Sequence, residues 1–259
     1  MSALRLHVEQ RGSGRYVVLV HGWGLDSRVW DTFRGKLVDV WRVVTVDLPG
    51  YGRSPWNAGA NSLDPMAEAL AEALPKDAVW VGWSLGGLVA SHVACRYPDC
   101  VRGLVLIASA PRFSEAPGWG CGMATPALRA FAKALREDRL ATLERFVRLV
   151  AQGGARTRFV VRYLRARLGD DVPDRGTLLA GLKQLEEADL RSSFVRIMCP
   201  VLQVLGAADE LLHHNAGLAT RTLHPALVTE VIPGAAHAPF ISHPKQTLSV
   251  LKRFLDGLR

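Results

Sequence analysis

The segment VWVGWSLGG (residues 79–87) is the most informative part of this 259-residue chain. It begins with a short apolar run typical of a buried strand, and a segment with helical spacing follows from residue 85 to residue 97. Between them, the pattern Gly-x-Ser-x-Gly puts small residues on both sides of Ser84, which allows a sharp turn that exposes the serine. A strand, this turn and a helix, in that order, predict that Ser84 is a nucleophile.

Similar apolar runs recur along the chain, each followed by Gly, Pro or Asp, and we predict that they are strands. They lie at residues 16–20, 43–46, 79–81, 101–107, 201–205 and 228–232, with an antiparallel edge strand expected at 4–9. Segments with helical spacing lie at 29–40, 63–74 and 85–97, and a terminal helix is expected around 246–258. Strands that alternate with helices predict the α/β fold class, a mostly parallel sheet with helices on both faces.

The alternation stops between residues 111 and 193, where four amphipathic helical patterns follow one another without a good strand candidate. We expect this stretch to be a helical cap, or lid, inserted into a single α/β domain that spans residues 1–259. A chain of this length is close to the size at which one compact domain stops growing.

A nucleophilic serine needs a general base and a carboxylate that orients the base, and both should follow later strands of the sheet. The segments GAAD (206–209) and GAAH (234–237) each come directly after such a strand. We therefore predict that His237 takes the proton of Ser84 and that Asp209 fixes the tautomer of the imidazole. Glu210 is an alternative acid, although it is more simply a solvated loop charge.

An oxyanion hole requires two backbone N–H donors near the nucleophile. Leu85, the residue after the serine, is expected to supply one, and Trp23 in the loop HGWG (21–24) the other. The Trp23 ring either forms a wall of the acyl pocket or only packs the loop, and His21 is interpreted as structural. The glycine-rich turn at 47–54 is interpreted as scaffold near the site.

This chemistry needs neither a cofactor nor a metal. The sequence contains no phosphate-binding glycine loop, no His-Glu-x-x-His motif and no acidic metal cluster. The four cysteines lack the spacing of a zinc site or a disulfide framework, so we expect reduced thiols. No apolar run approaches the roughly 18 residues of a membrane span, so a soluble cytoplasmic protein is expected. We also expect a monomer.

The net charge of +8 is concentrated in one segment of the chain. Residues 128–168 hold eleven Lys and Arg against three acidic residues, and the rest of the chain is balanced. A localised basic block indicates a local acidic partner more than a general affinity for nucleic acid, and we expect no nucleic-acid partner. A solvated helical face is the alternative interpretation.

Taken together, these segments resemble the α/β-hydrolases and, among them, the pimeloyl-acyl-carrier-protein methyl ester esterases of biotin synthesis. The similar stretches are HGWGLDSRVWDTF (21–33), VDLPGYGRS (46–54), VGWSLGGLVASHVA (81–94) and AAHAPFISHP (235–244). The resemblance covers the whole chain, and it implies a serine esterase that acts on a pimeloyl methyl ester carried by an acidic acyl carrier protein. In that family a phenylalanine of the cap lines the acyl channel.

The cap motif here is LERFV (143–147), so the resemblance makes Phe146 the channel candidate. Val147 and Val150 are expected beside it in the substrate-binding set.

Arginines of the cap hold the carrier in that family. The resemblance implies this role for Arg145, and for Arg158 and Arg162, which lie four residues apart on one helical face. A further family arginine, four residues before Arg145, is matched here only by Ala141, with Arg139 nearby. The cap is the poorest match to the family, and it is the part that selects the substrate.

Two other functions remain open at this point. The same three side chains would serve a general short-chain carboxylesterase or an acyltransferase. A binding protein that keeps the hydrolase fold without turnover belongs to a different class, and it would not react with a fluorophosphonate at Ser84.

Overall fold

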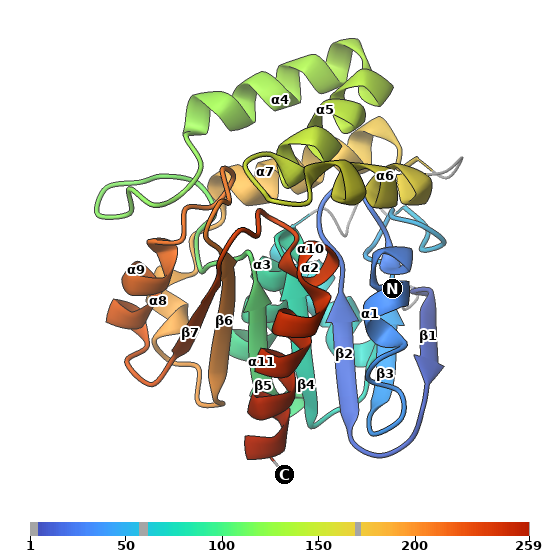
Figure 1. The fold of residues 1–259 in the computed structure, drawn as a ribbon, viewed down its shortest axis with the longest axis vertical. Helices are drawn as coiled ribbons and strands as arrows, with labels where there is room; N and C mark the ends of the chain where they lie inside the picture. Colours follow the sequence, from blue (N-terminus) through green and yellow to red (C-terminus); the bar gives the residue numbers. More distant parts are fainter. Residues whose placement is uncertain (1–4, 57–61, 169–171, 259) are drawn as a thin grey trace.

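We describe residues 5–56, 62–168 and 172–258 in a computed structural model of the chain (Figure 1). Seven strands form one sheet in the order β1-β3-β2-β4-β5-β6-β7. Their bounds are β1 (Val8–Arg11), β2 (Tyr16–Val20), β3 (Arg42–Val46), β4 (Ala78–Trp83), β5 (Val101–Ile107), β6 (Val201–Gly206) and β7 (Val228–Ile232). Strand β1 is antiparallel to β3, and every other pairing is parallel. The predicted α/β fold class is confirmed.

The inner strands are buried along almost their whole length, as expected for a parallel sheet that helices cover on both sides. Figure 1 shows α1 and α11 on the near face of the sheet and α2 and α3 on the far face. Helices outside residues 111–193 are α1 (Asp31–Arg34), α2 (Leu63–Ala73), α3 (Leu85–Arg96), α9 (Ala216–Leu223), α10 (Pro239–Ser242) and α11 (Pro244–Gly257), with 3₁₀ turns η1 (Ser27–Trp30) and η3 (Pro98–Cys100).

Two sequence predictions were wrong in extent. The edge strand expected at 4–9 runs from Val8 to Arg11, because its register with β3 ends where Val8 pairs with Val46; Leu4 lies outside the described residues. The helix expected at 29–40 ends at Arg34. Gly35, a residue with a low helix propensity, follows it. In the next turns, hydrogen bonds span three residues instead of four, such as that from the Leu37 N–H to the Arg34 carbonyl.

Residues 111–193, which we call the cap, lie between the adjacent strands β5 and β6. Its helices are α4 (Thr125–Glu137), α5 (Arg139–Ala151), α6 (Thr157–Leu168) and α7 (Arg175–Glu187), followed by the short α8 (Arg191–Phe194). Figure 1 shows α4 to α7 gathered over one end of the sheet, where the parallel strands finish. Within the described ranges, no helix is both long enough and apolar enough to span a membrane.

Candidate active site

Ser84 lies in the sharp turn between β4 and α3. Its backbone has φ 54° and ψ −118°, a conformation that costs a non-glycine residue about 1–3 kcal/mol. The turn is tight, and a Cβ added to Gly82 or Gly86 would collide with facing backbone atoms. Two hydrogen bonds hold the turn: Ser84 N–H donates to the Ile107 carbonyl at 2.9 Å, and Ser109 Oγ donates to the Ser84 carbonyl at 2.8 Å.

The side chains of Ser84, His237 and Asp209 form a hydrogen-bonded chain at this edge of the sheet. His237 Nε2 lies 2.9 Å from Ser84 Oγ, and His237 Nδ1 lies 2.7 Å from Asp209 Oδ2. Because an ionised carboxylate only accepts, the hydrogen of the ring is assigned to Nδ1, and Nε2 is left to accept the serine proton. The three residues are 2%, 1% and 5% exposed, so these bonds are shielded from water.

The loop after β6 turns the Asp209 carboxylate toward the imidazole. Asp209 Oδ1 accepts hydrogen bonds from the N–H groups of Leu211 at 2.8 Å and Leu212 at 3.0 Å. Glu210, the alternative acid, accepts a hydrogen bond from Nε2 of Gln152 in the cap at 2.5 Å. Of the two acids, Asp209 is the one in contact with the base.

We call the sharp turn at Ser84 between β4 and α3 the elbow. The loop after β2 runs beside the elbow, because Val20 pairs with Gly82 in the register of β2 and β4. Gly86 in the first turn of α3 packs directly against the Val20 carbonyl. Neither the Trp23 N–H nor the Leu85 N–H donates to an acceptor among the described residues. The two candidate oxyanion donors therefore lie on neighbouring segments and are available for a ligand.

The buried side chain of His21 joins the loop after β2 to the turn after β3. The Leu48 N–H donates to His21 Nε2 at 2.9 Å, which assigns the ring hydrogen to Nδ1, 2.8 Å from the Gly22 carbonyl. Burial lowers the pKa of His21, although the nearby Asp47 acts in the opposite direction. Both ring nitrogens are thus engaged with backbone, which fits a structural role.

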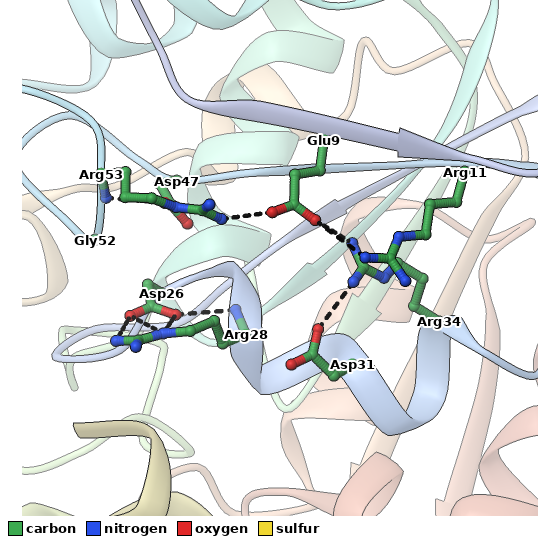
Figure 2. Close-up of a pocket in the computed structure, with 9 residues that line it drawn as sticks. All are labelled: Glu9, Arg11, Asp26, Arg28, Asp31, Arg34, Asp47, Gly52 and Arg53. Carbon is green, nitrogen blue, oxygen red and sulfur yellow. Dashed lines mark hydrogen bonds and ion pairs between the residues drawn. The ribbon is translucent and has the colours of Figure 1, made fainter. Parts of the chain in front are cut away.

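The turn at 47–54 is tied to the same loop by a charged network (Figure 2). Asp47 accepts from the backbone N–H groups of Ser27 at 2.8 Å and Arg53 at 3.0 Å. Glu9 on β1 pairs with Arg34 at 2.9 Å and with Arg53 at 2.6 Å. The hydrogen bonds from Arg34 and then Arg53 lower the pKa of Glu9 to about 2. This network braces the edge strand against the turn.

A narrow apolar cavity with a volume of about 20 Å³ reaches Ser84 from the cap. It is lined by Trp23, Ser84, Phe113, Met123, Leu128, Phe131, Phe146, Leu182, Leu185 and Leu211. The rings of Trp23 and Phe146 meet edge to face, with centroids 4.8 Å apart. This volume is room for about one water molecule, so an aliphatic chain would enter only if the lining side chains moved apart. It would then find apolar side chains along its length and a single hydroxyl at the end of the cavity.

The cavity contains one of the three cap residues predicted to bind substrate. Phe146 lines it, whereas Val147 and Val150 are buried in α5 and are not among the lining residues that the structure describes. The Val150 carbonyl accepts a hydrogen bond from the His237 N–H at 3.2 Å instead. Sequence analysis missed Phe113, whose ring lies edge to face with the His237 imidazole at a centroid distance of 6.0 Å.

The other lining residues that the sequence analysis missed come mostly from the apolar faces of α4 and α7. Spacings such as Leu128 with Phe131, and Leu182 with Leu185, are the signal that could have identified them. That signal marks a buried helix face, and it does not say what the face covers.

The cap is bonded to the loop after β2 and the η1 turn at several points. Trp23 Nε1 donates to the Leu178 carbonyl of α7 at 2.8 Å. From α6, the Tyr163 hydroxyl donates to the Val29 carbonyl at 3.1 Å, and Arg167 Nε donates to the Arg28 carbonyl at 3.1 Å. The candidate oxyanion loop is therefore held by the cap as well as by the sheet.

The three arginines expected to hold a carrier are exposed on two adjoining helices. Arg145 is on α5, with its guanidinium 5.1 Å from the centroid of the Phe131 ring, which lines the cavity. Arg158 and Arg162 are both on α6. Arg139, near the unmatched family position, donates to the Pro173 carbonyl at 3.2 Å, and Ala141 lies in the first turn of α5.

Over residues 5–56, 62–168 and 172–258, no group of three or more His, Cys, Asp or Glu side chains is arranged to hold a metal ion. All four cysteines are free thiols in the structure.

Comparison with known proteins is consistent with this geometry. A model of the alpha/beta hydrolase family matches residues 17–250. The pimeloyl-[acyl-carrier protein] methyl ester esterase of Yersinia pseudotuberculosis is 40% identical over 241 residues, 93% of each chain. The protein of the same name from Methylococcus capsulatus is 40% identical over 251 residues, 96% of this chain and 98% of its own.

Among solved structures, the esterase EaEST from Exiguobacterium antarcticum superposes with a TM-score of 0.87 at 22% identity, over 98% of this chain and 96% of that one. This likeness concerns the fold alone. The two sequence relatives reach further, because their identity extends over nearly the whole chain. The chain belongs to the α/β-hydrolase family and, within it, to the family of the pimeloyl-[acyl-carrier protein] methyl ester esterases.

Proposed function

We propose that this protein hydrolyses the methyl ester of a pimeloyl group attached to acyl carrier protein, by way of an acyl-enzyme on Ser84. The observation that carries the proposal is the hydrogen-bonded chain from Ser84 through His237 to Asp209, at the inner end of an apolar cavity. The names of the relatives that are 40% identical support the choice of substrate.

In the first half of the reaction, Ser84 Oγ attacks the ester carbonyl while His237 Nε2 takes the hydroxyl proton. Asp209 stays ionised and stabilises the imidazolium that forms. The carbonyl oxygen becomes negatively charged and accepts hydrogen bonds from the N–H groups of Trp23 and Leu85, each worth about a hundredfold or more in rate. The start of α3 at Leu85 adds the positive end of a helix dipole. His237 then protonates the leaving oxygen, and methanol departs.

In the second half, a water molecule gives a proton to His237 and attacks the acyl-enzyme. The same donors stabilise the second tetrahedral intermediate, the Ser84 oxygen recovers its proton from His237, and the free carboxylate leaves. No electron transfer occurs, and the imidazole returns to its starting protonation state.

The cap supplies the recognition that this substrate requires. Phe146 and the other apolar lining residues suit the methylene chain of a pimeloyl group. The basic surface of α5 and α6, with Arg145, Arg158 and Arg162, suits an acidic carrier that stays outside while its acyl chain enters. All the proposed groups come from one chain, so we propose that the enzyme acts as a monomer, and the free thiols suit the cytoplasm.

Mass spectrometry of two substrates tests the proposal. The protein is incubated with pimeloyl-carrier methyl ester and, separately, with a free pimelate methyl ester, and release of the carboxylate is followed at low and high salt. Cleavage of the carrier ester should slow by about tenfold as salt rises, while cleavage of the free ester should change little. Equal salt responses would point to a general carboxylesterase.

A serine pair controls for the reaction itself. Ser84→Ala should reduce turnover of both esters by about 10⁴-fold or more and abolish fluorophosphonate labelling. Ser91→Ala is the matched control, because Ser91 is also buried and bonds within α3 to the Gly87 carbonyl at 2.8 Å. Normal turnover by the Ser84 variant would contradict the acyl-enzyme mechanism, whatever the substrate.

A further inference from the structure

His237 lies in the six-residue connection between β7 and α10, where no strand ladder fixes its main chain. Its ring is held by Asp209 and Ser84, but the ring can keep those contacts only if the main chain stays in place. Two hydrogen bonds hold the two peptide groups of this residue. The N–H donates to the Val150 carbonyl of α5, and the carbonyl accepts from Trp83 Nε1 at 2.7 Å.

Trp83 immediately precedes the nucleophile in the elbow. Its backbone therefore fixes the start of the Ser84 turn, while its side chain bonds to the main chain of the base. A single residue thus relates the position of His237 to that of Ser84. We propose that Trp83 is a positioning residue that sets the separation of the serine hydroxyl and the imidazole through its indole N–H.

The indole is packed so that it has little freedom to move. It is fully buried, its ring meets the Phe240 ring at 5.3 Å and 68°, and it lies 6.0 Å from the imidazole. Gly22 of the oxyanion loop lies against its other edge, where an added Cβ would be 2.9 Å from the indole Cε3. A rigid donor of this kind can hold the carbonyl of a loop residue at a fixed distance.

Trp83 does not line the cavity within the part of the chain that the structure describes. Loss of its N–H should therefore affect the reaction and leave substrate binding nearly unchanged. The inference rests on the proposed role of His237 as the base, and the experiment below separates the two.

The chain offers two matched controls for Trp83→Phe. Trp80→Phe also removes a buried indole N–H that bonds to a carbonyl, that of Cys100 at 3.1 Å, but away from His237. Trp30→Phe removes a buried indole N–H that has no hydrogen-bond partner among the described residues, from a ring that packs on the same Phe240 at 4.2 Å. The three variants thus make the same chemical change with and without a bond to the base.

Steady-state kinetics on a free ester should show kcat of Trp83→Phe reduced about tenfold, with KM within about twofold of wild type. Trp80→Phe and Trp30→Phe should keep kcat within about threefold. Thermal unfolding, measured alongside, should shift by similar amounts in Trp83→Phe and Trp80→Phe, since each leaves one buried carbonyl without its donor.

A proton NMR spectrum gives an independent readout, because the hydrogen on His237 Nδ1 resonates far downfield when it is held against Asp209. This signal should broaden or shift in Trp83→Phe and stay unchanged in Trp80→Phe. If kcat and the downfield signal of Trp83→Phe match those of Trp80→Phe, the positioning role is overturned. Turnover by Ser84→Ala would instead overturn the proposed function.

A second variant covers the case in which Trp83→Phe does not fold. Phe240→Leu keeps the indole N–H but removes the ring that packs on it, so the donor loses its fixed position. A loss of kcat of about sixfold, outside the threefold range of the controls, without a change in KM is expected. An unchanged kcat in this variant would count against the proposal in the same way.

Discussion

The edge of the sheet and the cap differ in how they hold their functional groups. At the sheet edge, Ser84, Asp209 and His237 are joined by short hydrogen bonds, and each is further bonded to backbone. In the cap, the inner surface is a set of apolar side chains in van der Waals contact, and the outer surface carries exposed arginines. In the proposed function, the sheet edge carries out the chemistry and the cap chooses the substrate.

This separation follows from the physical nature of the two regions. The loops at the sheet edge continue from parallel strands that hydrogen bonds lock in register, so small displacements there are costly. Apolar contacts between helices are not directional, so the side chains that line the cavity can change while the backbone carbonyls of Val150 and Leu178 keep their bonds to His237 and Trp23. Changes at the sheet edge should lower the rate for every ester, and changes in the cap should lower it for some.

The largest effect is expected at the acid. Asp209→Asn should lower kcat about 10⁴-fold for every ester, because an amide no longer fixes the required tautomer of His237. Glu210→Gln is the control, since Glu210 bonds to Gln152 in the cap, and its activity should stay within about threefold of wild type. Stopped-flow or steady-state assays of both variants decide between the two acids. If Glu210→Gln lost more activity than Asp209→Asn, Glu210 would be the carboxylate that orients His237.

A smaller and selective effect is expected in the cavity. Phe146→Ala should reduce kcat/KM for a free pimeloyl ester about thirtyfold, corresponding to about 2 kcal/mol of lost apolar contact. Hydrolysis of an acetyl ester, whose acyl group is five carbons shorter, should change much less. Phe159→Ala, which removes a half-exposed aromatic of α6, is the control. Equal losses for both esters would mean that Phe146 supports the sheet edge instead of the acyl chain.

On the outer surface of the cap, the effect should depend on the carrier. The double variant Arg158→Glu and Arg162→Glu should lower kcat/KM for a carrier-bound ester about tenfold at low salt and leave a free ester unchanged. Lys183→Glu, an exposed charge reversal on α7, should do neither. If the double variant slowed the free ester as well, the arginines would be acting on the fold.

The smallest effect concerns stability at the edge strand. Because the pKa of Glu9 is lowered to about 2 from 4.5, its ion pairs stabilise the protein above pH 4.5, and this contribution disappears as pH falls toward 2. Urea unfolding of Glu9→Gln should show a loss of about 1 kcal/mol at pH 6 that shrinks at pH 3, with kcat unchanged. Glu68→Gln, on the exposed side of α2, should show no such pH dependence.

The strands were the most predictable part of the molecule. Strands buried on both faces appear in the sequence as continuous apolar runs, and β5 occupies the range expected from its run. Strand β7 also occupies its expected range, although it lies at the edge of the sheet and is largely exposed. The edge strand β1 was displaced because it is polar and takes its limits from its pairing with β3. The helix predicted at 29–40 is too long because α1 ends at Arg34, where Gly35, a residue with a low helix propensity, follows.

At the candidate site, topology was enough to bring Ser84, Asp209 and His237 together, since each follows a strand of one parallel sheet. The lining of the cavity could not be obtained in the same way. Helical spacing identifies Phe131 and Leu185 as buried, but the angle at which a cap helix crosses the sheet depends on packing between distant segments. The bond from Trp83 to the His237 carbonyl is likewise a product of tertiary packing, with no local sequence signal.

Trp23 has a mechanical consequence for how esters reach the serine. Its indole is bonded to α7, and α6 is bonded to the segment a few residues further on. The cap helices α6 and α7 therefore cannot move away from the sheet without breaking these hydrogen bonds or distorting the loop that carries Trp23. Because the cavity measures only about 20 Å³, a long acyl chain must push the lining side chains apart while these hydrogen bonds keep the loop in place. Esters with bulky or branched acyl groups should therefore react more slowly than esters with straight chains.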